Sequence, residues 1–160
     1  MRILILGNGG SGKTTLAQQI STRFKWPLLS LDALYWRENY QKWPMEVFIE
    51  KTHDFISRHD AWVIEGTPEK DIRFRLEKAT HVIFLDVPTW RCLWRIFLRQ
   101  IKRGANQQAG TLSLKTLKWV FFYKQRNGRA LLEIIDSKKV IIIRSRSQIK
   151  ALILDLKTSL

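Results

Sequence analysis

The chain has 160 residues, of which 45% are hydrophobic and 26% charged, ordinary values for one soluble globular domain. The formal net charge of +14 indicates anionic partners. The longest apolar runs, such as Val140 to Ile143, are too short to span a bilayer, and a single cysteine, Cys92, excludes an internal disulfide and a zinc–cysteine cluster. The N-terminus leads into a short apolar run and a glycine loop, not into a signal peptide. We therefore expect a cytoplasmic protein with no membrane partner, either a monomer or a homodimer.

Short apolar segments rich in β-forming residues alternate along the chain with longer helical stretches. Their continuous apolar character predicts strands that are buried on both faces, and hence a parallel sheet. We expect helices from Thr14 to Phe24 and after Pro44. This alternation predicts an α/β fold that forms one domain over residues 1–160. The expected strands are Ile3–Leu6, Leu28–Leu31, Trp62–Glu65, Val82–Asp86 and Val140–Ile143.

A phosphate-binding loop lies directly after the first expected strand. The segment Gly7-Asn8-Gly9-Gly10-Ser11-Gly12-Lys13-Thr14 fits the pattern G-x-x-x-x-G-K-[ST] and precedes a helix, as the pattern requires. Glycines allow a tight loop whose backbone N–H groups surround an anion, and the helix adds its positive N-terminal end. We expect this segment and Thr15 to bind ATP. Lys13 would reach the β- and γ-phosphates, and the Thr14 hydroxyl would ligate Mg²⁺.

Acidic residues follow several of the expected strands, at the sheet edge where open α/β sheets bind ligands. Asp32 is a candidate catalytic residue that would orient or deprotonate an acceptor hydroxyl; the alternative is an N-cap for the next short helix. Asp86 is a candidate for holding the metal through water, or it is simply the turn-forming end of a strand. Glu65, which precedes Gly66, is a candidate for the metal's outer shell.

A block without any acidic residue extends from Val87 through Leu132. Within it, helical spacing places four arginines on one face of a helix and a set of apolar residues on the other face, which we expect to be buried. The arginine face either surrounds an anion, because guanidinium groups fit phosphate oxygens, or is a solvated face of a basic protein. The arginines are Arg91, Arg95, Arg99 and Arg103, and the apolar residues are Leu93, Trp94, Phe97 and Ile101. An insert from Gly104 to Ser113 lacks an apolar period.

The chain resembles two families, of which the second is related to the first. Asp86-Val87-Pro88, with Arg95 and Arg99 after it, resembles the adenylate kinases. More closely, the chain resembles the bacterial DNA topology modulation protein family, which is adenylate-kinase-like. The matching motifs extend over nearly the whole chain: the P-loop, Leu31-Asp32 with Tyr35-Trp36, Trp62-Val63-Ile64-Glu65-Gly66, Phe84-Leu85-Asp86 with Pro88 and Trp90-Arg91-Cys92-Leu93, and Ile143-Arg144-Ser145-Arg146.

The resemblance implies a P-loop NTPase fold in three α/β/α layers, with five parallel strands in the order 2-3-1-4-5 and a short helical lid at about 103–118. It implies ATP binding, and the family's name implies an influence on DNA supercoiling. In these kinases Arg95 would lie on the adenine and Arg99 near the phosphates. An arginine after the lid, Arg126 or else Arg129, would contact the transferring phosphoryl group, and we prefer Arg126. The acceptor-gripping arginine of nucleoside monophosphate kinases is replaced here by Glu69, which disfavours AMP as the acceptor.

Three functions remain open from the sequence. The first is a Mg²⁺-dependent phosphotransferase that moves the ATP γ-phosphoryl group to a small acceptor, for which a nucleoside or nucleotide is one possibility. The second is a basic nucleic-acid-binding ATPase or regulator that affects DNA topology; the charge and the seven tryptophans favour weak, non-specific binding. The third is a nucleotide-binding switch without transfer. Tyr35, Trp36, Tyr40 and Trp43 either stack on a ligand or pack in the core, and the three histidines are expected to have no metal role.

Overall fold

The structure is a computed structural model that describes residues 1–35, 42–66, 71–103, 114–123 and 140–158. Its strands are β1 (Arg2–Gly7), β2 (Leu28–Ser30), β3 (Trp62–Glu65), β4 (His81–Leu85) and β5 (Val140–Ile143). Its helices are α1 (Lys13–Phe24), α2 (Leu31–Tyr35), α3 (Met45–Arg58), α4 (Ile72–Lys78), α5 (Thr89–Arg103), α6 (Leu114–Tyr123) and α8 (Arg146–Thr158). Each of the expected strands is present, with bounds within one residue of the expectation.

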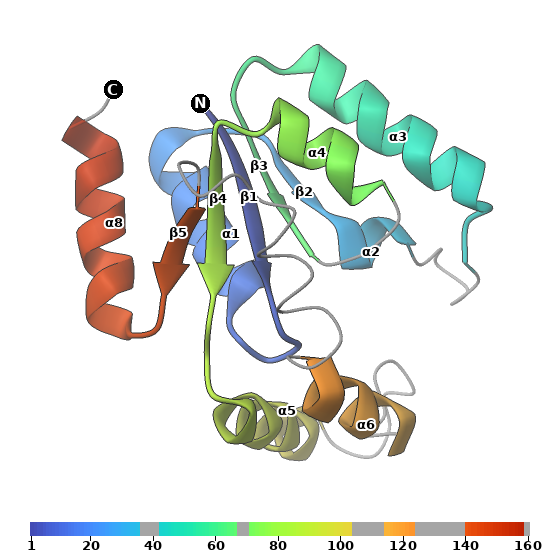
Figure 1. The fold of residues 1–160 in the computed structure, drawn as a ribbon, viewed down its shortest axis with the longest axis vertical. Helices are drawn as coiled ribbons and strands as arrows, with labels where there is room; N and C mark the ends of the chain where they lie inside the picture. The colour runs from blue at the N-terminus through green and yellow to red at the C-terminus, as the bar shows by residue number, and fades with distance from the viewer. Residues whose placement is uncertain (36–41, 67–70, 104–113, 124–139, 159–160) are drawn as a thin grey trace.

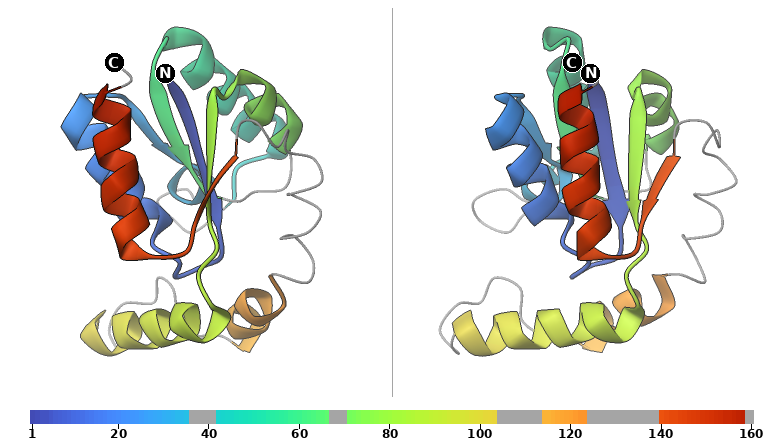
Figure 2. Two further views of the ribbon diagram at one scale, coloured as in Figure 1. Left: turned by 60° about the vertical axis from the view of Figure 1, so that its left-hand side comes forward. Right: turned by 90° about the vertical axis from the view of Figure 1, so that its left-hand side faces the viewer.

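The five strands form one parallel sheet in the order β2-β3-β1-β4-β5, as the resemblance implied. Alternate residues of β1 face opposite sides of the sheet. Leu4 and Leu6 pack under α3 and α4, whereas Ile3 and Ile5 pack under α1 and α8. Both faces of the central strands are therefore buried, which explains their unbroken apolar sequence. Figures 1 and 2 show the resulting three layers, with α1 and α8 on one face of the sheet and α3 and α4 on the other.

Helices α5 and α6 belong to neither layer. Figure 1 shows both of them beyond the carboxyl ends of the strands, and Figure 2 shows α5 extending across that end of the molecule. The P-loop between β1 and α1 opens at the same end, so α5 and α6 cover the place where open α/β sheets bind their ligands. Among the described residues, no helix combines the length and the hydropathy needed to cross a bilayer.

Most of the expected lid lies outside the described residues, as do Trp36, Tyr40, Glu69, Arg126 and Arg129. Helix α6 begins within the expected lid and ends before Arg126. Tyr35 and Trp43, the described pair of the four aromatics near Asp32, pack against the core beneath α3, which favours the packing interpretation over ligand stacking. Cys92 is fully buried, as expected for a small apolar residue.

Candidate functional site at the P-loop

Left-handed backbone conformations shape the loop between β1 and α1. Gly10 has φ +75° and Gly12 has φ +102°, a region that side chains other than glycine rarely adopt. A Cβ atom on Gly10 would lie 2.5 Å from the backbone oxygen of Cys92, so this glycine also lets α5 approach the loop. The Ser11 N–H donates to the Asn8 carbonyl at 3.2 Å and closes the turn. The sequence pattern thus forms the strand, loop and helix that a phosphate cradle requires.

Lys13 is buried at the base of this loop. Its Nζ donates a hydrogen bond to the Asn8 carbonyl oxygen at 3.0 Å. Burial lowers the pKa of Lys13; nearby Asp32 and Glu65 oppose that shift, and Arg99 adds to it. These influences place four of the candidate residues within electrostatic reach of one another, although they come from α1, α2, β3 and α5. Lys13 is therefore the centre of a site with charges of both signs.

Glu65 joins α1 and β2 at the end of β3. Its Oε1 accepts hydrogen bonds from Ser30 Oγ at 2.6 Å and from Thr14 Oγ1 at 3.3 Å, and the side chain is only 1% exposed. Its Oε2 is also buried and has no hydrogen-bond partner among the described residues. A buried carboxylate oxygen without a donor is costly unless a cation or water reaches it. Glu65 and the Thr14 hydroxyl therefore offer the hard oxygen donors that Mg²⁺ prefers.

Asp86, the candidate for holding the metal through water, contacts the neighbouring strand. Its Oδ2 accepts from Arg144 Nε at 3.0 Å, and its N–H donates to the Ile143 carbonyl, so it ties the end of β4 to the end of β5. The acid that contacts Thr14 is Glu65. Within the described residues, no group of three or more histidine, cysteine or acidic side chains is arranged to hold a metal.

Asp32 lies in the first turn of α2 and is exposed, at the same edge as Lys13. Gly66, at φ +117°, makes room for this turn: a Cβ there would lie 2.9 Å from Leu31 Cβ and 3.4 Å from the Asp32 backbone nitrogen. Because helix α2 begins at Leu31, Asp32 lies inside the helix and is not the residue that precedes it. The glycine at the end of β3 thus accommodates the β2–α2 turn that presents the Asp32 carboxylate.

The arginine face of α5 turns toward the P-loop. Arg95 Nη1 donates to the Ser11 carbonyl at 2.9 Å and to the Gly10 carbonyl at 3.4 Å. Arg99 lies close enough to Lys13 to lower its pKa. Arg91, one turn before Arg95, is exposed and sits over the Trp90 ring. The structure therefore brings two of the four arginines to the loop; the side chain of Arg103 lies outside what it describes.

The expected burial of the apolar face of α5 was wrong. Trp94 is 56% exposed and Ile101 61% exposed, and Phe97 is exposed as well. The residues that α5 packs against the P-loop are instead Cys92 and Ile96, which lie beside the arginines on the helix. Helical spacing separated the two faces correctly, but the side of α5 that turns inward carries Cys92, Arg95 and Ile96 and not the expected apolar residues.

Asn8 makes a contact that the sequence pattern did not reveal. Its Nδ2 donates to the Val120 carbonyl of α6 at 2.8 Å in a buried position, and its Oδ1 accepts from the Gly9 N–H at 2.8 Å. The variable second position of the P-loop thereby holds α6 over the loop. Such a position carries no signal in the pattern, which leaves it unrestricted. Thr15, the residue after the loop, is exposed on α1. Of the three histidines, His53 pairs with Asp71 at 2.9 Å, away from the loop.

Solved structures of kinases share this fold. Shikimate kinase from Acinetobacter baumannii, in complex with shikimate, superposes with a TM-score of 0.65 and 18% sequence identity, over 99% of this chain and 94% of that one. Shikimate kinase from Bacteroides thetaiotaomicron gives 0.58 and 18%, over 99% and 97%. Deoxyadenosine kinase from M. mycoides, solved with its products dCMP and dCDP, gives 0.63 and 14%, over 99% and 100%. At such identities the likeness establishes the fold.

Sequence comparison places the P-loop half of the chain in a family. No curated protein sequence matches the chain. The sequence profile of the ATPase family associated with various cellular activities (AAA) matches residues 3–87, which include β1, the P-loop and the edge that carries Asp32 and Glu65. Because this match covers more than half of the 160 residues, the chain belongs to the ATPase family associated with various cellular activities (AAA).

Proposed function

We propose that the protein is an ATP-dependent phosphotransferase that moves the γ-phosphoryl group of ATP to a hydroxyl of a small acceptor. The observation that carries the proposal is the convergence of Lys13, Asp32, Glu65 and Arg99 on one edge of the sheet. Phosphoryl transfer requires cations for the phosphate charge, an oxygen ligand for the metal and an acid that accepts the acceptor's proton. This edge offers all three kinds of group.

Each cationic residue would contact a different part of the nucleotide. Lys13 and the loop's N–H groups would bind the β- and γ-phosphates, and the Lys13 Nζ would exchange the Asn8 carbonyl for phosphate oxygens. Arg99 would stabilise charge on the phosphoryl group as it leaves ATP. Arg95 already binds the Ser11 carbonyl, so it is less available than Arg99 to the transferring group, and its place on the adenine is proposed on the resemblance alone. Arg126 remains a candidate for the transferring group on the resemblance alone.

The residues at the end of β3 fit a magnesium ion. Thr14 Oγ1 lies 3.3 Å from Glu65 Oε1. The other oxygen, Oε2, is buried without a hydrogen-bond partner among the described residues, so it could accept a hydrogen bond from a metal-bound water. When bound, Mg²⁺ would neutralise phosphate charge. We propose Thr14 as its direct protein ligand and Glu65 in its outer shell. Asp86 is the weaker candidate, because its carboxylate pairs with Arg144.

The acceptor is proposed to be a small molecule. The kinases with this fold include one solved with shikimate and one solved with dCMP and dCDP, all of them small molecules. Asp32, exposed at the carboxyl edge and near Lys13, is the described acid best placed to accept a proton from an acceptor hydroxyl. We further propose that the chain is a single kinase-like domain whose lid, at about 103–118, excludes water from the reaction.

A transfer screen tests the proposal. Labelled [γ-³²P]ATP and Mg²⁺ would be offered with nucleosides, nucleotides and small hydroxy acids, and labelled products counted. Lys13→Ala should abolish transfer to any acceptor found. Glu65→Gln should weaken the response to Mg²⁺ on the order of 10- to 100-fold, the usual range for outer-shell changes. Glu77→Gln, at an exposed site on α4, is the matched control and should leave transfer unchanged. Transfer that survives Lys13→Ala would refute the proposal.

A nucleic-acid-binding ATPase or regulator of DNA topology is the second candidate. The absence of acidic residues from Val87 through Leu132 favours it, since such a block attracts any polyanion. Against it, Arg95 donates to the Ser11 carbonyl of the P-loop and Arg99 lies within electrostatic reach of Lys13, so both border the proposed nucleotide site. The two candidates differ in whether DNA and Mg-ATP compete.

A further inference from the structure

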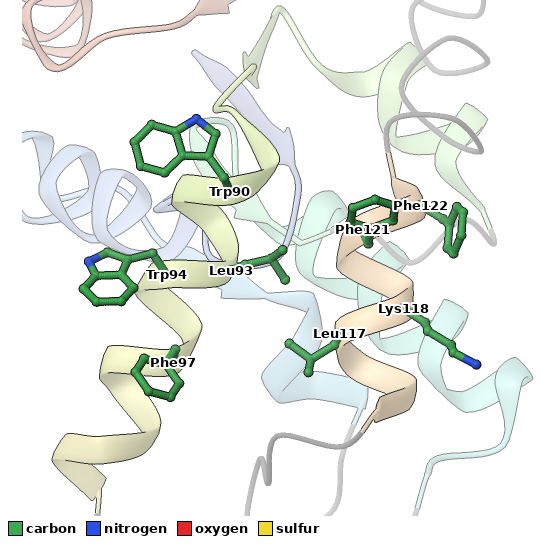
Figure 3. Close-up of a pocket in the computed structure, with 8 residues that line it drawn as sticks. All are labelled: Trp90, Leu93, Trp94, Phe97, Leu117, Lys118, Phe121 and Phe122. Atoms are coloured by element: carbon green, nitrogen blue, oxygen red, sulfur yellow. The ribbon is translucent and has the colours of Figure 1, made fainter.

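The outward side of α5 and α6 carries a continuous set of exposed apolar side chains, which we call the aromatic face. Its members are Trp90, Trp94, Phe97, Leu98 and Ile101 of α5 and Phe121 and Phe122 of α6, each at least 38% exposed. Figure 3 shows Leu93 and Leu117 pointing toward one another across a groove between the two helices. The groove has a volume of about 830 Å³, and among the described residues that line it Lys118 is the one charged side chain.

Helix α5 cannot bury this face by rotating about its axis. Its opposite side already contacts the P-loop through Cys92 and Ile96, and Arg95 donates to the Ser11 carbonyl. On a wheel of about 100° per residue, Trp90, Trp94 and Ile101 fall within 40° of one another, and Cys92 and Ile96 lie on the far side. The P-loop contacts therefore hold the aromatic face outward, and an exposed group of large apolar side chains with polar residues at its border is typical of an interaction site.

Charge restricts what can cover the aromatic face. The block from Val87 through Leu132 has ten lysines and arginines and no acidic residue. Two of these cations border the face: Arg91, whose guanidinium lies 5.1 Å from the centroid of the Trp90 ring, and the exposed Lys118. An apolar stripe rich in tryptophan and phenylalanine, bordered by cations without acids, is the pattern of helices that lie in the interface of a membrane. Indole rings favour that interface because they are apolar with one polar N–H.

We propose that the aromatic face of α5 and α6 docks on the surface of a membrane that carries anionic lipid headgroups. The apolar side chains would enter the boundary between headgroups and acyl chains, and Arg91 and Lys118 would contact lipid phosphates. This differs from the expectation of no membrane partner, which considered only spanning segments. Arg95 keeps its bond to the Ser11 carbonyl in this arrangement, so docking leaves the contacts between α5 and the P-loop in place.

Other occupants fit the aromatic face less well. A second copy would bring two acid-free basic blocks together, and their like charges would repel. A single-stranded nucleic acid would need bases to stack on aromatic rings with a basic groove beside them, but Leu98 and Ile101 offer no ring, and Arg95 is bound to the P-loop. An anionic membrane uses both the aliphatic and the aromatic members of the face.

Vesicle binding tests the proposal with the full chain. Vesicles of two parts phosphatidylcholine and one part phosphatidylglycerol should bind the protein in co-sedimentation and shift its tryptophan emission to shorter wavelength. Vesicles of phosphatidylcholine alone should bind it far more weakly. Arg91→Gln should weaken binding about five-fold, the usual effect of one cation near an anionic surface. Equal binding to both kinds of vesicle, or to neither, would overturn the proposal.

Matched variants locate the docking face. Trp94→Glu and Phe121→Glu should each weaken vesicle binding on the order of ten-fold or more. The control is Leu154→Glu on α8, where a leucine is 60% exposed on another side of the molecule, and it should bind vesicles like the parent chain. All three variants should retain ATP binding, which shows that they fold. Unchanged vesicle binding in Trp94→Glu would reject the face. A dimer seen by light scattering, or an oligonucleotide complex, that Trp94→Glu abolishes would assign the face to those partners instead.

Discussion

Gly10 is the residue whose missing side chain lets helix α5 approach the P-loop. Its backbone has φ +75°, and a Cβ there would lie 2.5 Å from the Cys92 carbonyl oxygen and 3.0 Å from Ile96 Cγ1. The carbonyl belongs to the helix backbone, so it cannot move away without shifting α5. Two penalties therefore coincide at this position: a strained dihedral angle and a steric conflict with backbone.

We predict that Gly10→Ala destabilises the protein by more than the usual ~1–3 kcal/mol for a non-glycine residue in this conformation. In a chain of this size each 1 kcal/mol lowers the Tm by about 2–4 °C, so calorimetry resolves the change. Gly9→Ala is the control, because the φ of Gly9 lies outside the left-handed region and a Cβ there meets only side chains, with Val120 Cγ2 at 3.1 Å. Equal losses of Tm in the two variants would contradict the role given to Gly10.

Burying the charged Lys13 side chain lowers the free energy of unfolding by an amount that depends on pH. Burial lowers its pKa below the 10.5 of an exposed lysine, so between the folded and unfolded pKa values the unfolded chain binds more protons. The contribution of Lys13 to the free energy of unfolding therefore rises with pH between these two pKa values. At pH values below the folded-state pKa, the cost of burying the charge is constant. Lys13→Met removes the charge and keeps the length, while the Asn8 carbonyl retains its bond from the Ser11 N–H.

We predict that Lys13→Met raises the free energy of unfolding relative to the parent chain at neutral pH and abolishes phosphoryl transfer. The difference in stability should shrink as the pH rises toward 10.5, because the parent's Lys13 then loses its proton in the folded state. Urea unfolding at several pH values measures it. A gap that widens with rising pH would show that Lys13 stabilises the folded chain.

The acidic residues at the strand ends show what the sequence pattern could predict about the site and what it could not. Glu65 ends β3 and Asp86 follows β4, the two strands that neighbour β1, and the sequence offered both acids as candidates for holding the metal indirectly. The structure joins Glu65 to Thr14 and Ser30, and Asp86 to Arg144. The sequence of a strand predicts where the strand ends. Which of the two acids reaches Thr14 of α1 depends instead on the twist of the sheet and on partners distant in sequence, such as Arg144.

The elements themselves were predictable to different degrees. Strands β1, β3 and β4 are buried on both faces, so their unbroken apolar runs revealed them without help from alternation. For α5 the spacing separated a basic from an apolar face, but it did not show which one faces the molecule. The direction is set by the P-loop, whose Gly10 and Ser11 carbonyls accept hydrogen bonds from Arg95 and whose Gly10 lets the backbone of α5 approach at Cys92. The rule that apolar faces turn inward fails where a helix covers a polar loop.

Position along α5 predicts different roles for its arginines. Arg99 lies near Lys13, whereas Arg91 is exposed beside Trp90. We predict that Arg99→Ala lowers kcat by more than it raises KM for ATP, if the guanidinium acts on charge that develops during transfer. A donor of this kind is usually worth about 10²–10³ in kcat. Steady-state kinetics with the acceptor from the transfer screen give both constants.

Arg91→Ala is the matched control for Arg99→Ala, since it removes an equal charge from the same helix. It should leave kcat within about two-fold of the parent value, because its side chain is directed at Trp90 and not at the P-loop. If both substitutions lower kcat alike, net charge and not position would account for the effect. A loss confined to KM in Arg99→Ala would mean that the side chain binds only the ground state.

At the scale of the whole molecule, a net charge of +14 must be reconciled with a nucleotide site. The acid-free block from Val87 through Leu132 includes the helix that covers the P-loop. Arg95 donates to the P-loop and Arg99 lies within electrostatic reach of Lys13, so both border the proposed nucleotide site, and any DNA that uses them must use the same surface. One arginine face cannot hold two polyanions at once, so DNA and nucleotide should exclude each other.

We predict weak, non-specific DNA binding that falls steeply with salt and that saturating Mg-ATP suppresses. Each phosphate neutralised by a lysine or arginine releases counterions and contributes about −0.9 to the slope of log affinity against log salt. Replacing both Arg95 and Arg99 by glutamine should therefore reduce the slope by about two, if they contact DNA phosphates. Fluorescence anisotropy with a labelled oligonucleotide, at several salt concentrations with and without Mg-ATP, measures affinity and slope together.

The control for this double variant is Arg23→Gln with Arg73→Gln, which removes equal charge from exposed positions on α1 and α4. It should change the salt slope less and leave the ATP effect intact, because neither arginine borders the P-loop. If ATP leaves DNA binding unchanged while the salt slope stays steep, the two ligands use separate surfaces and the second candidate function gains support. Salt-insensitive binding that distinguishes sequences would contradict the electrostatic account, since base recognition and not phosphate charge would then carry the affinity.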